Sequence, residues 1–404
     1  MAYFIICISL FSILFYLYRF QKTGNISLVL PIFYNTVVLY VIFGVSILTY
    51  AVEDPFHLYN QISHDDLYGA AIILIVASLS FYVGGGLAKN GTNSQLPGQN
   101  KISSNIRHQK TLILGILTLY FIYVVGYGVE SLISRRGYID LTFERNKTIL
   151  LFFFIVAPFV TSLIPFIKNN ILKYLTYLIC FLILFSSSSR YLVMLPFLYI
   201  IGSFLRYKKI KLNIIFLNGC LIALSLIFVL QIRYYTFHGL IPNLTSLFTK
   251  GIDVDYLFEG LNYAFSFSLF GIAYVLKNFT HDTIAFLISI NPLPSYFIDI
   301  NYMTSVQEMK RTAPFSAVSI LALAGYPTLI FFYALTGFCF TFIINRMRNA
   351  TVLYYAVVGL FIMFTLFSIQ YNLRGSSRFF YYSILLFILF MLLKNLRFRV
   401  RRAG

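Results

Sequence analysis

The chain alternates long apolar runs with short polar segments, a pattern that predicts helices crossing a membrane. Runs of this kind span a hydrocarbon core about 30 Å thick. The eleven candidate transmembrane segments are 2–18, 26–52, 67–88, 111–129, 148–167, 174–189, 191–205, 212–232, 315–345, 350–373 and 379–393. We therefore predict an all-α polytopic integral membrane protein with about 11 transmembrane helices, within a range of ten to twelve.

One pair of segments depends on a polar interruption. Read as a single helix, residues 174–205 would be about 48 Å long, too long for one bilayer without extreme tilt. The run Ser186–Arg190 lies at its centre, and a basic cluster follows its end. These features predict two short helices joined by a tight outer tip.

The composition excludes two other classes of protein. Only 11% of the residues are charged, whereas about a quarter are charged in a soluble globular domain. The chain contains 44 Phe and 32 Tyr, which a disordered chain would lack. The net charge of +18 would suggest nucleic acid in a soluble protein, but in a membrane protein it must first be divided by side. No nucleic-acid partner is predicted.

The charge distribution predicts the orientation. If residues 19–25 face the cytoplasm, the loops on that side hold 19 basic residues and no acidic one, whereas the opposite loops hold 12 basic and all 13 acidic residues. Cytoplasmic loops are enriched in Lys and Arg. We therefore expect the N-terminus to lie outside and the C-terminus in the cytoplasm.

The longest segment between spans covers residues 233–314 and is predicted to fold as a large outer loop within a single domain, 1–404. It is neither repetitive nor rich in Gly and Ser. Its apolar pieces, Tyr263–Leu276 and Thr283–Ile290, are shorter than a span. They are expected to form amphipathic or re-entrant helices on the outer face.

Basic residues on the outer side are the main candidates for function, because topology signals disfavour them there. A Ser-Ser-Arg sequence occurs twice, at 188–190 and 376–378, each time closing a short outer turn before an apolar run. Guanidinium groups supply planar, bidentate donors that match phosphate oxygens. The alternative is that these side chains reach the interface or pair with the outer acids. The predicted substrate-binding residues are Arg190, Arg233, Arg374 and Arg378, with Arg135, Arg136, Arg145 and Arg311 as further members.

The outer acids are candidates for proton transfer. Glu259 or Glu308 is the predicted general base, and the sequence does not choose between them. Metal binding by Asp65 and Asp66 is an alternative, since carboxylates suit Mg or Mn, but solvation at the surface explains these acids as well. No metal and no cofactor is therefore predicted.

The sequence resembles the O-antigen polymerase family of Wzy-type oligosaccharide repeat unit polymerases. The likeness consists of ten to twelve spans, a Ser-rich tip ending in Ser188-Ser189-Arg190 before Tyr191-Leu192, and one dominant late outer loop. That loop closes with three short stretches: Ile290-Asn291-Pro292-Leu293-Pro294, Ala313-Pro314-Phe315-Ser316 and Gly325-Tyr326-Pro327.

The resemblance implies a glycosyltransferase of the C-type membrane class at the periplasmic face of the bacterial inner membrane. Its substrate would be an undecaprenyl-diphosphate-linked oligosaccharide, which it would polymerise into O-antigen or a related surface polysaccharide. Family members rely on periplasmic arginines, a role that the resemblance transfers to the arginines above. A chain-length-determinant protein is a further candidate partner beside the lipid bilayer.

Three other functions compete. An O-antigen ligase would use the same arginines with a different acceptor. A metal-dependent glycosyltransferase using a lipid monophosphate sugar would place the metal on Asp65-Asp66 and would be sensitive to EDTA. A lipid-linked oligosaccharide flippase would need charged groups along a path through the bilayer, yet the predicted spans contain no acidic residue.

Overall fold

The chain folds into two compact helical units. The computed structural model describes residues 1–48, 62–88, 109–137, 145–189, 191–207, 212–233, 235–261, 265, 267–293, 295–309, 313–348 and 350–403. Unit 1 comprises residues 1–98 and 261–404, and unit 2 comprises residues 99–260. The long loop 233–314 is thus divided between the two units.

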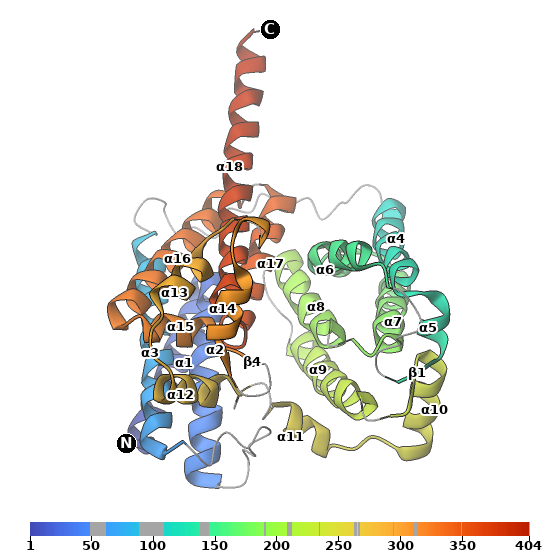
Figure 1. Ribbon diagram of the computed structural model, residues 1–404. Coiled ribbons are helices and arrows are strands. Elements are labelled where there is room, and N and C mark those ends of the chain that lie inside the picture. The colour runs from blue at the N-terminus through green and yellow to red at the C-terminus, as the bar shows by residue number, and fades with distance from the viewer. Residues whose placement is uncertain are drawn as a thin grey trace. The chain divides into compact units, whose positions relative to one another are not determined.

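Unit 1 contains most of the long apolar helices. Its α-helices are α1 (Ala2–Thr23), α2 (Val29–Phe43), α3 (His64–Leu87), α12 (Phe267–Asn278), α13 (Thr283–Ile290), α14 (Ile300–Val306), α15 (Ala317–Leu323), α16 (Tyr326–Arg346), α17 (Thr351–Phe367) and α18 (Leu373–Ala403). The shorter elements are the 3-10 helices η1 (Ile26–Leu28) and η6 (Ser295–Phe297), the π-helical turn η2 (Gly44–Leu48), and the antiparallel strands β3 (Glu308–Met309) and β4 (Ala313–Pro314). The chain's two ends lie at opposite ends of this unit (Figure 1).

Unit 2 is built around five apolar helices. Its α-helices are α4 (Gln109–Tyr127), α5 (Val129–Ile133), α6 (Lys147–Thr161), α7 (Asn170–Ser186), α8 (Tyr191–Tyr207), α9 (Leu212–Arg233), α10 (Leu240–Lys250) and α11 (Asp255–Leu261). The 3-10 helix η4 (Ile164–Phe166) follows α6, and the strands β1 (Arg135–Arg136) and β2 (Phe237–His238) form an antiparallel pair.

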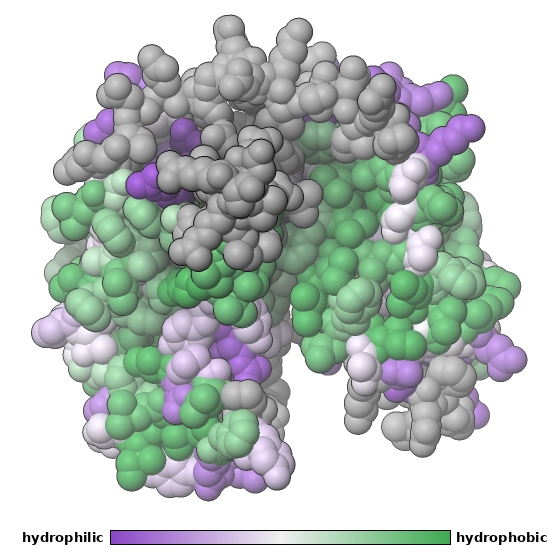
Figure 2. Space-filling view, turned by 90° about the horizontal axis from the view of Figure 1, so that it is seen from above, coloured by the Kyte–Doolittle hydropathy of each residue, from purple (hydrophilic) through white to green (hydrophobic). Residues whose placement is uncertain are grey.

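The predicted fold class is confirmed, since the chain is an all-α polytopic membrane protein. Among the described residues, eight helical stretches are long and apolar enough to cross a membrane, and three shorter apolar helices cover 170–186, 191–203 and 353–367. Every one of the eleven predicted segments coincides with one of these stretches. Figure 2 shows hydrophobic residues over much of the surface of each unit, as expected of helices that face lipid.

The predicted hairpin at 174–205 is confirmed. Helix α7 ends at Ser186 and α8 begins at Tyr191. Ser188 adopts a left-handed backbone conformation with φ of 54°, which few residues other than glycine tolerate. This conformation accompanies the reversal of the chain within a few residues.

The segment predicted as one span at 315–345 is instead two helices, α15 and α16. Gly325 separates them with φ of +101°, a conformation that glycine adopts without steric cost. Pro327 then lies in the first turn of α16, where its missing N–H costs nothing. The sequence Gly325-Tyr326-Pro327 is therefore a helix break followed by a new start.

The last predicted transmembrane segment begins earlier in the structure than the sequence predicts. Helix α17 ends at Phe367, and α18 already begins at Leu373 rather than at 379. The side chain of Asn372 accepts a hydrogen bond from the Gly375 N–H at 2.7 Å, which caps the first turn of α18. Ser376-Ser377-Arg378 therefore belongs to a helix, and the expectation that it closes a turn is wrong.

The apolar piece 263–276 is predicted to form an amphipathic or re-entrant helix. Helix α12 within it is buried along Phe267–Val275 and packs against α3 and α15, so it is not amphipathic. Its far end is fixed by an ion pair of 2.8 Å between Lys277 and Asp66. A short apolar helix that is buried on all sides leaves the re-entrant alternative as the prediction.

Close packing of α3 on α16 forms the centre of unit 1. A Cβ placed on Gly84 would lie 1.9 Å from the carbonyl oxygen of Ala334, and one placed on Gly337 would lie 2.2 Å from that of Phe81. Only glycine permits such an approach of two backbones, which is typical of helix pairs in membranes. Gly84 and Gly337 therefore serve helix packing.

A cluster of hydroxyl groups joins α2, α16 and the end of α17 in unit 1. The Tyr34 hydroxyl of α2 lies 2.8 Å from that of Tyr333 on α16 and 2.6 Å from Ser368 Oγ after α17. Such interhelical hydrogen bonds contribute about 0.6–2 kcal/mol each in a membrane.

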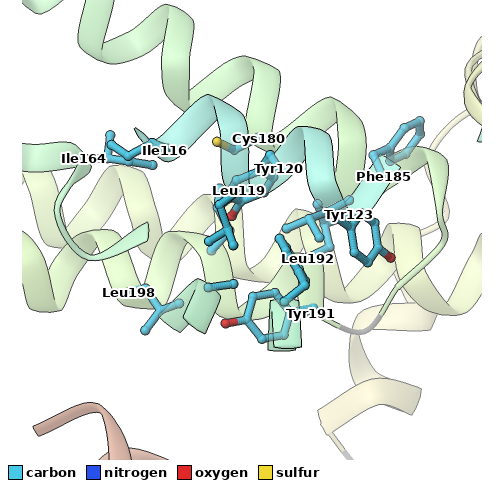
Figure 3. Close-up of a cluster of buried hydrophobic side chains, with 14 of the residues drawn as sticks. Ile116, Leu119, Tyr120, Tyr123, Ile164, Cys180, Phe185, Tyr191, Leu192 and Leu198 are labelled. Atoms are coloured by element: carbon cyan, nitrogen blue, oxygen red, sulfur yellow. The ribbon is translucent and has the colours of Figure 1, made fainter. Parts of the chain in front are cut away.

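The core of unit 2 is aromatic. Figure 3 shows Tyr120 and Tyr123 of α4 beside Cys180 of α7 and the first residues of α8, Tyr191 and Leu192. The Tyr120 hydroxyl lies 2.8 Å from Thr161 Oγ1, so this buried polar atom has a partner. The core thus brings the start of α8 against α4 and positions the serine-rich tip beside it.

Candidate functional site

The serine-rich tip between α7 and α8 is largely buried rather than open to solvent. Ser186, Ser187 and Ser188 are each less than 5% exposed. Their hydroxyls are used locally: Ser186 Oγ donates to Ile183 O and Ser187 Oγ to Leu184 O. The Ser189 Oγ accepts a hydrogen bond from the N–H of Tyr191. The serines therefore shape the turn.

Arg135 fastens this tip from β1. Its Nη1 donates to the carbonyls of Ser131 at 2.9 Å and Ser186 at 3.0 Å. Its Nη2 donates to the carbonyl of Ser187 at 3.1 Å and to Ser188 Oγ at 3.4 Å. The last carbonyls of a helix lack hydrogen-bond donors within it and carry partial negative charge. A guanidinium at the end of α7 supplies these carbonyls with both donors and a positive charge.

Two further side chains hold the same turn. Asn243 of α10 donates to the carbonyl of Phe185 at 3.0 Å and to Ser188 Oγ at 3.3 Å. The hydroxyl of Tyr127 donates to the carbonyl of Ser187 at 3.3 Å. Sequence reasoning missed both residues. Asn243 follows Phe185 by 58 positions, and a contact over such a separation leaves no local signal in the sequence.

His238 lies opposite Arg135 in the β1–β2 pair and is fully buried. Burial lowers the pKa of His238, and the charge of Arg135 lowers it further. The imidazole is therefore neutral at neutral pH. A buried histidine packed at this strand pair is out of reach of a hydroxyl arriving from solvent.

Arg145 has an unused terminal donor. Its guanidinium carbon lies 4.3 Å from the centroid of the Tyr127 ring, and that of Arg135 lies 5.4 Å from the same ring. Among the residues that the structure describes, the buried Arg145 Nη2 has no hydrogen-bond partner. The structure thus brings Arg135 and Arg145 to one tyrosine ring beside the tip, which comes much later in the sequence.

The remaining arginines of unit 2 differ in position. Arg136 is exposed on β1, and Arg233 is exposed at the last residue of α9. Arg190, the end of the first Ser-Ser-Arg sequence, lies outside the described residues, as does Arg311 of the long loop. Their predicted roles remain predictions.

We expect Arg135→Ala to destabilise unit 2 strongly, because it leaves the carbonyls of Ser131 and Ser186 without this donor and the Ser187 carbonyl with Tyr127 alone. Hydrogen bonds to charged groups contribute about 1.5–3 kcal/mol each, so a loss of about 2–4 kcal/mol is expected in thermal unfolding of the purified protein. The neighbouring Arg136→Ala, at an exposed position, should change stability by less than about 0.5 kcal/mol. Equal effects of the two substitutions would contradict the role of Arg135 at the tip.

Arg374 of unit 1 donates hydrogen bonds to backbone carbonyls at a helix end, as Arg135 does in unit 2. Its Nη1 donates to the carbonyls of Ile288 at 3.1 Å and Asn291 at 3.0 Å, and its Nη2 donates to that of Leu293 at 2.6 Å. The Tyr381 hydroxyl donates to the carbonyl of Ile290. Residues 374 and 381 are two helical turns apart on one face of α18, so this face fixes the end of α13.

Arg378 follows Arg374 by one turn on nearly the same face of α18. It is half-buried, and among the described residues no hydrogen bond or ion pair is found for its guanidinium. Continued at alternating steps of four and three residues, the positions 374, 378 and 381 lead to Leu385, Ile388 and Leu392. Those three residues are between 49% and 55% exposed. The Arg378 guanidinium therefore precedes a row of exposed apolar side chains on nearly the same face of α18, which we call the exposed apolar stripe.

The two candidate general bases are not brought into one unit. Glu308 lies half-buried on β3 in unit 1, paired in register with Pro314 of β4. Glu259 lies on α11 in unit 2. Of the two, Glu308 shares a unit with Arg374 and Arg378.

Asp66, which the sequence offered with Asp65 as an alternative metal ligand, makes other contacts. Asp66 Oδ2 accepts a hydrogen bond from the Ser63 N–H at 3.0 Å, forming a capping box at the start of α3, and also accepts from Lys277 Nζ. Within the described ranges, no group of three or more His, Cys, Asp or Glu side chains is placed to hold a metal ion.

Comparison with known proteins identifies no relative. No family model matches the chain, and no curated protein or solved structure matches it significantly.

Proposed function

We propose that this protein is a polysaccharide polymerase that joins undecaprenyl-diphosphate-linked oligosaccharide repeat units at the periplasmic face of the bacterial inner membrane. It acts as a glycosyltransferase of the C type, with the growing polymer on one lipid carrier as donor and a lipid-linked repeat unit as acceptor. The N-terminus is periplasmic and the C-terminus cytoplasmic, as the positive-inside rule predicts.

The observation that carries this proposal is the face of α18 described above. A polyprenyl diphosphate has a charged head and a long hydrocarbon tail. Arg378 supplies an unengaged, half-buried guanidinium near the start of a membrane-spanning helix, and the exposed side chains of Leu385, Ile388 and Leu392 follow it toward the bilayer centre. The Arg378 guanidinium matches the diphosphate head of such a lipid, and the three apolar side chains match its hydrocarbon tail.

The chemistry requires little besides charge stabilisation. The acceptor hydroxyl forms a bond to the anomeric carbon while the bond from that carbon to the diphosphate oxygen breaks. The electron pair leaves with the diphosphate, whose developing charge a preorganised guanidinium stabilises. The hydroxyl proton passes to a carboxylate, for which Glu308 is the better placed candidate because it lies in the same unit as Arg378.

Arg145 is a second candidate contact for phosphate. Its buried Nη2 has no partner among the described residues, while stacking on Tyr127 holds the rest of the guanidinium. A cation fixed on an aromatic face with one donor unused suits a ligand oxygen.

The glycan phenotype of a deletion strain tests the function. A polymerase mutant should keep single repeat units on the lipid A core and lose every longer chain. Loss of the single units together with the polymer would instead indicate an O-antigen ligase or a flippase. An unchanged ladder of chain lengths on a gel of surface polysaccharide would refute all three assignments.

A further inference from the structure

The segment from α13 to η6 in unit 1 presents an unusual amount of apolar surface. Five large side chains within fifteen residues are at least half exposed: Ile284, Leu287, Leu293, Tyr296 and Phe297. Tyr296 is 92% exposed. Monomeric soluble surfaces rarely gather so many large apolar side chains, and such patches mark contact with a partner or a membrane.

The place where this segment is attached indicates which partner it meets. The end of α13 is held by Arg374 and Tyr381, on the face of α18 that continues as the exposed stripe Leu385, Ile388 and Leu392. Helix α18 includes a candidate membrane span from Leu373 to Leu392. The segment therefore rests on the same face of a transmembrane helix whose next turns are open to lipid.

The hydrogen bonding of the α13 end fits a nonaqueous setting. Four backbone carbonyls at that end, those of Ile288, Ile290, Asn291 and Leu293, accept hydrogen bonds from Arg374 and Tyr381. In water such carbonyls can be satisfied by solvent, whereas in lipid each must find a donor within the protein.

The helix that follows the segment is polar. Helix α14 exposes Asn301, Thr304 and Ser305, and the Tyr302 hydroxyl donates to Asp282 at 2.8 Å, near the start of α13. A helix with exposed polar side chains is therefore joined to the apolar segment.

We propose that the segment from α13 to η6 is inserted into the interfacial part of the bilayer, with Ile284, Leu287, Leu293, Tyr296 and Phe297 in contact with lipid hydrocarbon and α14 facing water. It lies on α18 as a membrane-surface anchor and places the outer end of that helix at the level of the lipid headgroups. This inference does not depend on the proposed activity.

The absence of tryptophan from the chain allows a direct test. Single substitutions Leu287→Trp and Phe297→Trp place a fluorophore in the apolar segment, and Ser305→Trp places one on the polar helix α14. Leu385→Trp reports the lipid-facing stripe of α18. Each full-length variant is reconstituted into phosphatidylcholine vesicles with and without bromine in the acyl chains, because bromine quenches tryptophan only over short distances.

We expect the brominated lipid to quench Leu287→Trp and Phe297→Trp at least twofold more than Ser305→Trp, and about as strongly as Leu385→Trp. Quenching of both apolar-segment variants at the level of Ser305→Trp, with Leu385→Trp strongly quenched, would overturn the proposal. In that case the patch would face water or another protein. All four positions are exposed, so the substitutions do not disturb the core.

Discussion

Replacing Arg378 by alanine should abolish long-chain polysaccharide while leaving the protein in the membrane. Removal of one preorganised donor to a developing oxyanion costs about 10²–10³ in rate, which is enough to reduce the product to single repeat units. Arg378→Lys should fail as well, because an ammonium group cannot reproduce the bidentate geometry of guanidinium. Arg190→Ala is expected to have the same effect. The measurement is the chain-length distribution of surface glycan, together with the amount of protein in the membrane.

A matched arginine at the other end of a helix in the same unit provides the control. Arg346 lies in the last turn of α16, with its guanidinium 5.7 Å from the Phe342 ring centroid, and the charge distribution places it on the cytoplasmic side. Arg346→Ala should leave the chain lengths unchanged. Normal long-chain product from Arg378→Ala, or equal loss from both substitutions, would count heavily against a diphosphate contact at Arg378.

The helices could be predicted from the sequence because each span is a local property of the chain. The hydrophobic runs locate the eleven long or medium apolar helices found among the described residues, and the serines at 186–189 locate the break between α7 and α8. The prediction was wrong where a helix break depends on backbone conformation, as at Gly325, and it left two alternatives open for α12, which is buried on all sides. At these positions residue type alone determines neither which helices cover a segment nor where the backbone breaks.

The roles of the candidate arginines could be predicted only in part. The sequence singled out Arg135 and Arg374 because the predicted orientation places them on the outer side, where basic residues are disfavoured. The structure shows both donating to backbone carbonyls at the end of another helix, 51 and 83 residues away in sequence. Such a contact leaves no local pattern. Arg206 acts in the same way, donating to the carbonyls of Pro165 and Ile167, although its basic neighbours suggested only a cytoplasmic loop.

These contacts alter what is expected of the two arginines as ligand-binding groups. In the described conformation the terminal nitrogens of Arg135 and Arg374 are engaged with the protein backbone. Arg378 and Arg145 differ in that terminal guanidinium nitrogens remain for a phosphate, among the contacts that the structure describes. Loss of polymer in Arg374→Ala would therefore not by itself indicate substrate binding, since the end of α13 would also be released.

The Gly84→Ala substitution should have the largest effect on stability, because it forces apart the two helices that form the centre of unit 1. Real Cβ atoms essentially never approach another heavy atom to within 3.0 Å, yet a Cβ on Gly84 would lie 1.9 Å from the Ala334 carbonyl oxygen. That oxygen belongs to the backbone of α16 and cannot move without the helix. We expect a loss of about 3 kcal/mol or more, at the upper end of the cost of overpacking, measured by thermal unfolding of the detergent-solubilised protein.

Gly86 provides the control for this effect, since it lies on the same helix two residues further on. A Cβ on Gly86 meets no atom within 4 Å, so Gly86→Ala should gain up to about 1 kcal/mol from the higher helix propensity of alanine. Gly337→Ala, whose Cβ would lie 2.2 Å from the Phe81 carbonyl oxygen, should resemble Gly84→Ala. Because the two sites form one contact, the double substitution should cost less than the sum of the single ones. Equal melting temperatures for Gly84→Ala and Gly86→Ala would mean that α3 and α16 are not in backbone contact, and the close crossing at the centre of unit 1 would have to be abandoned.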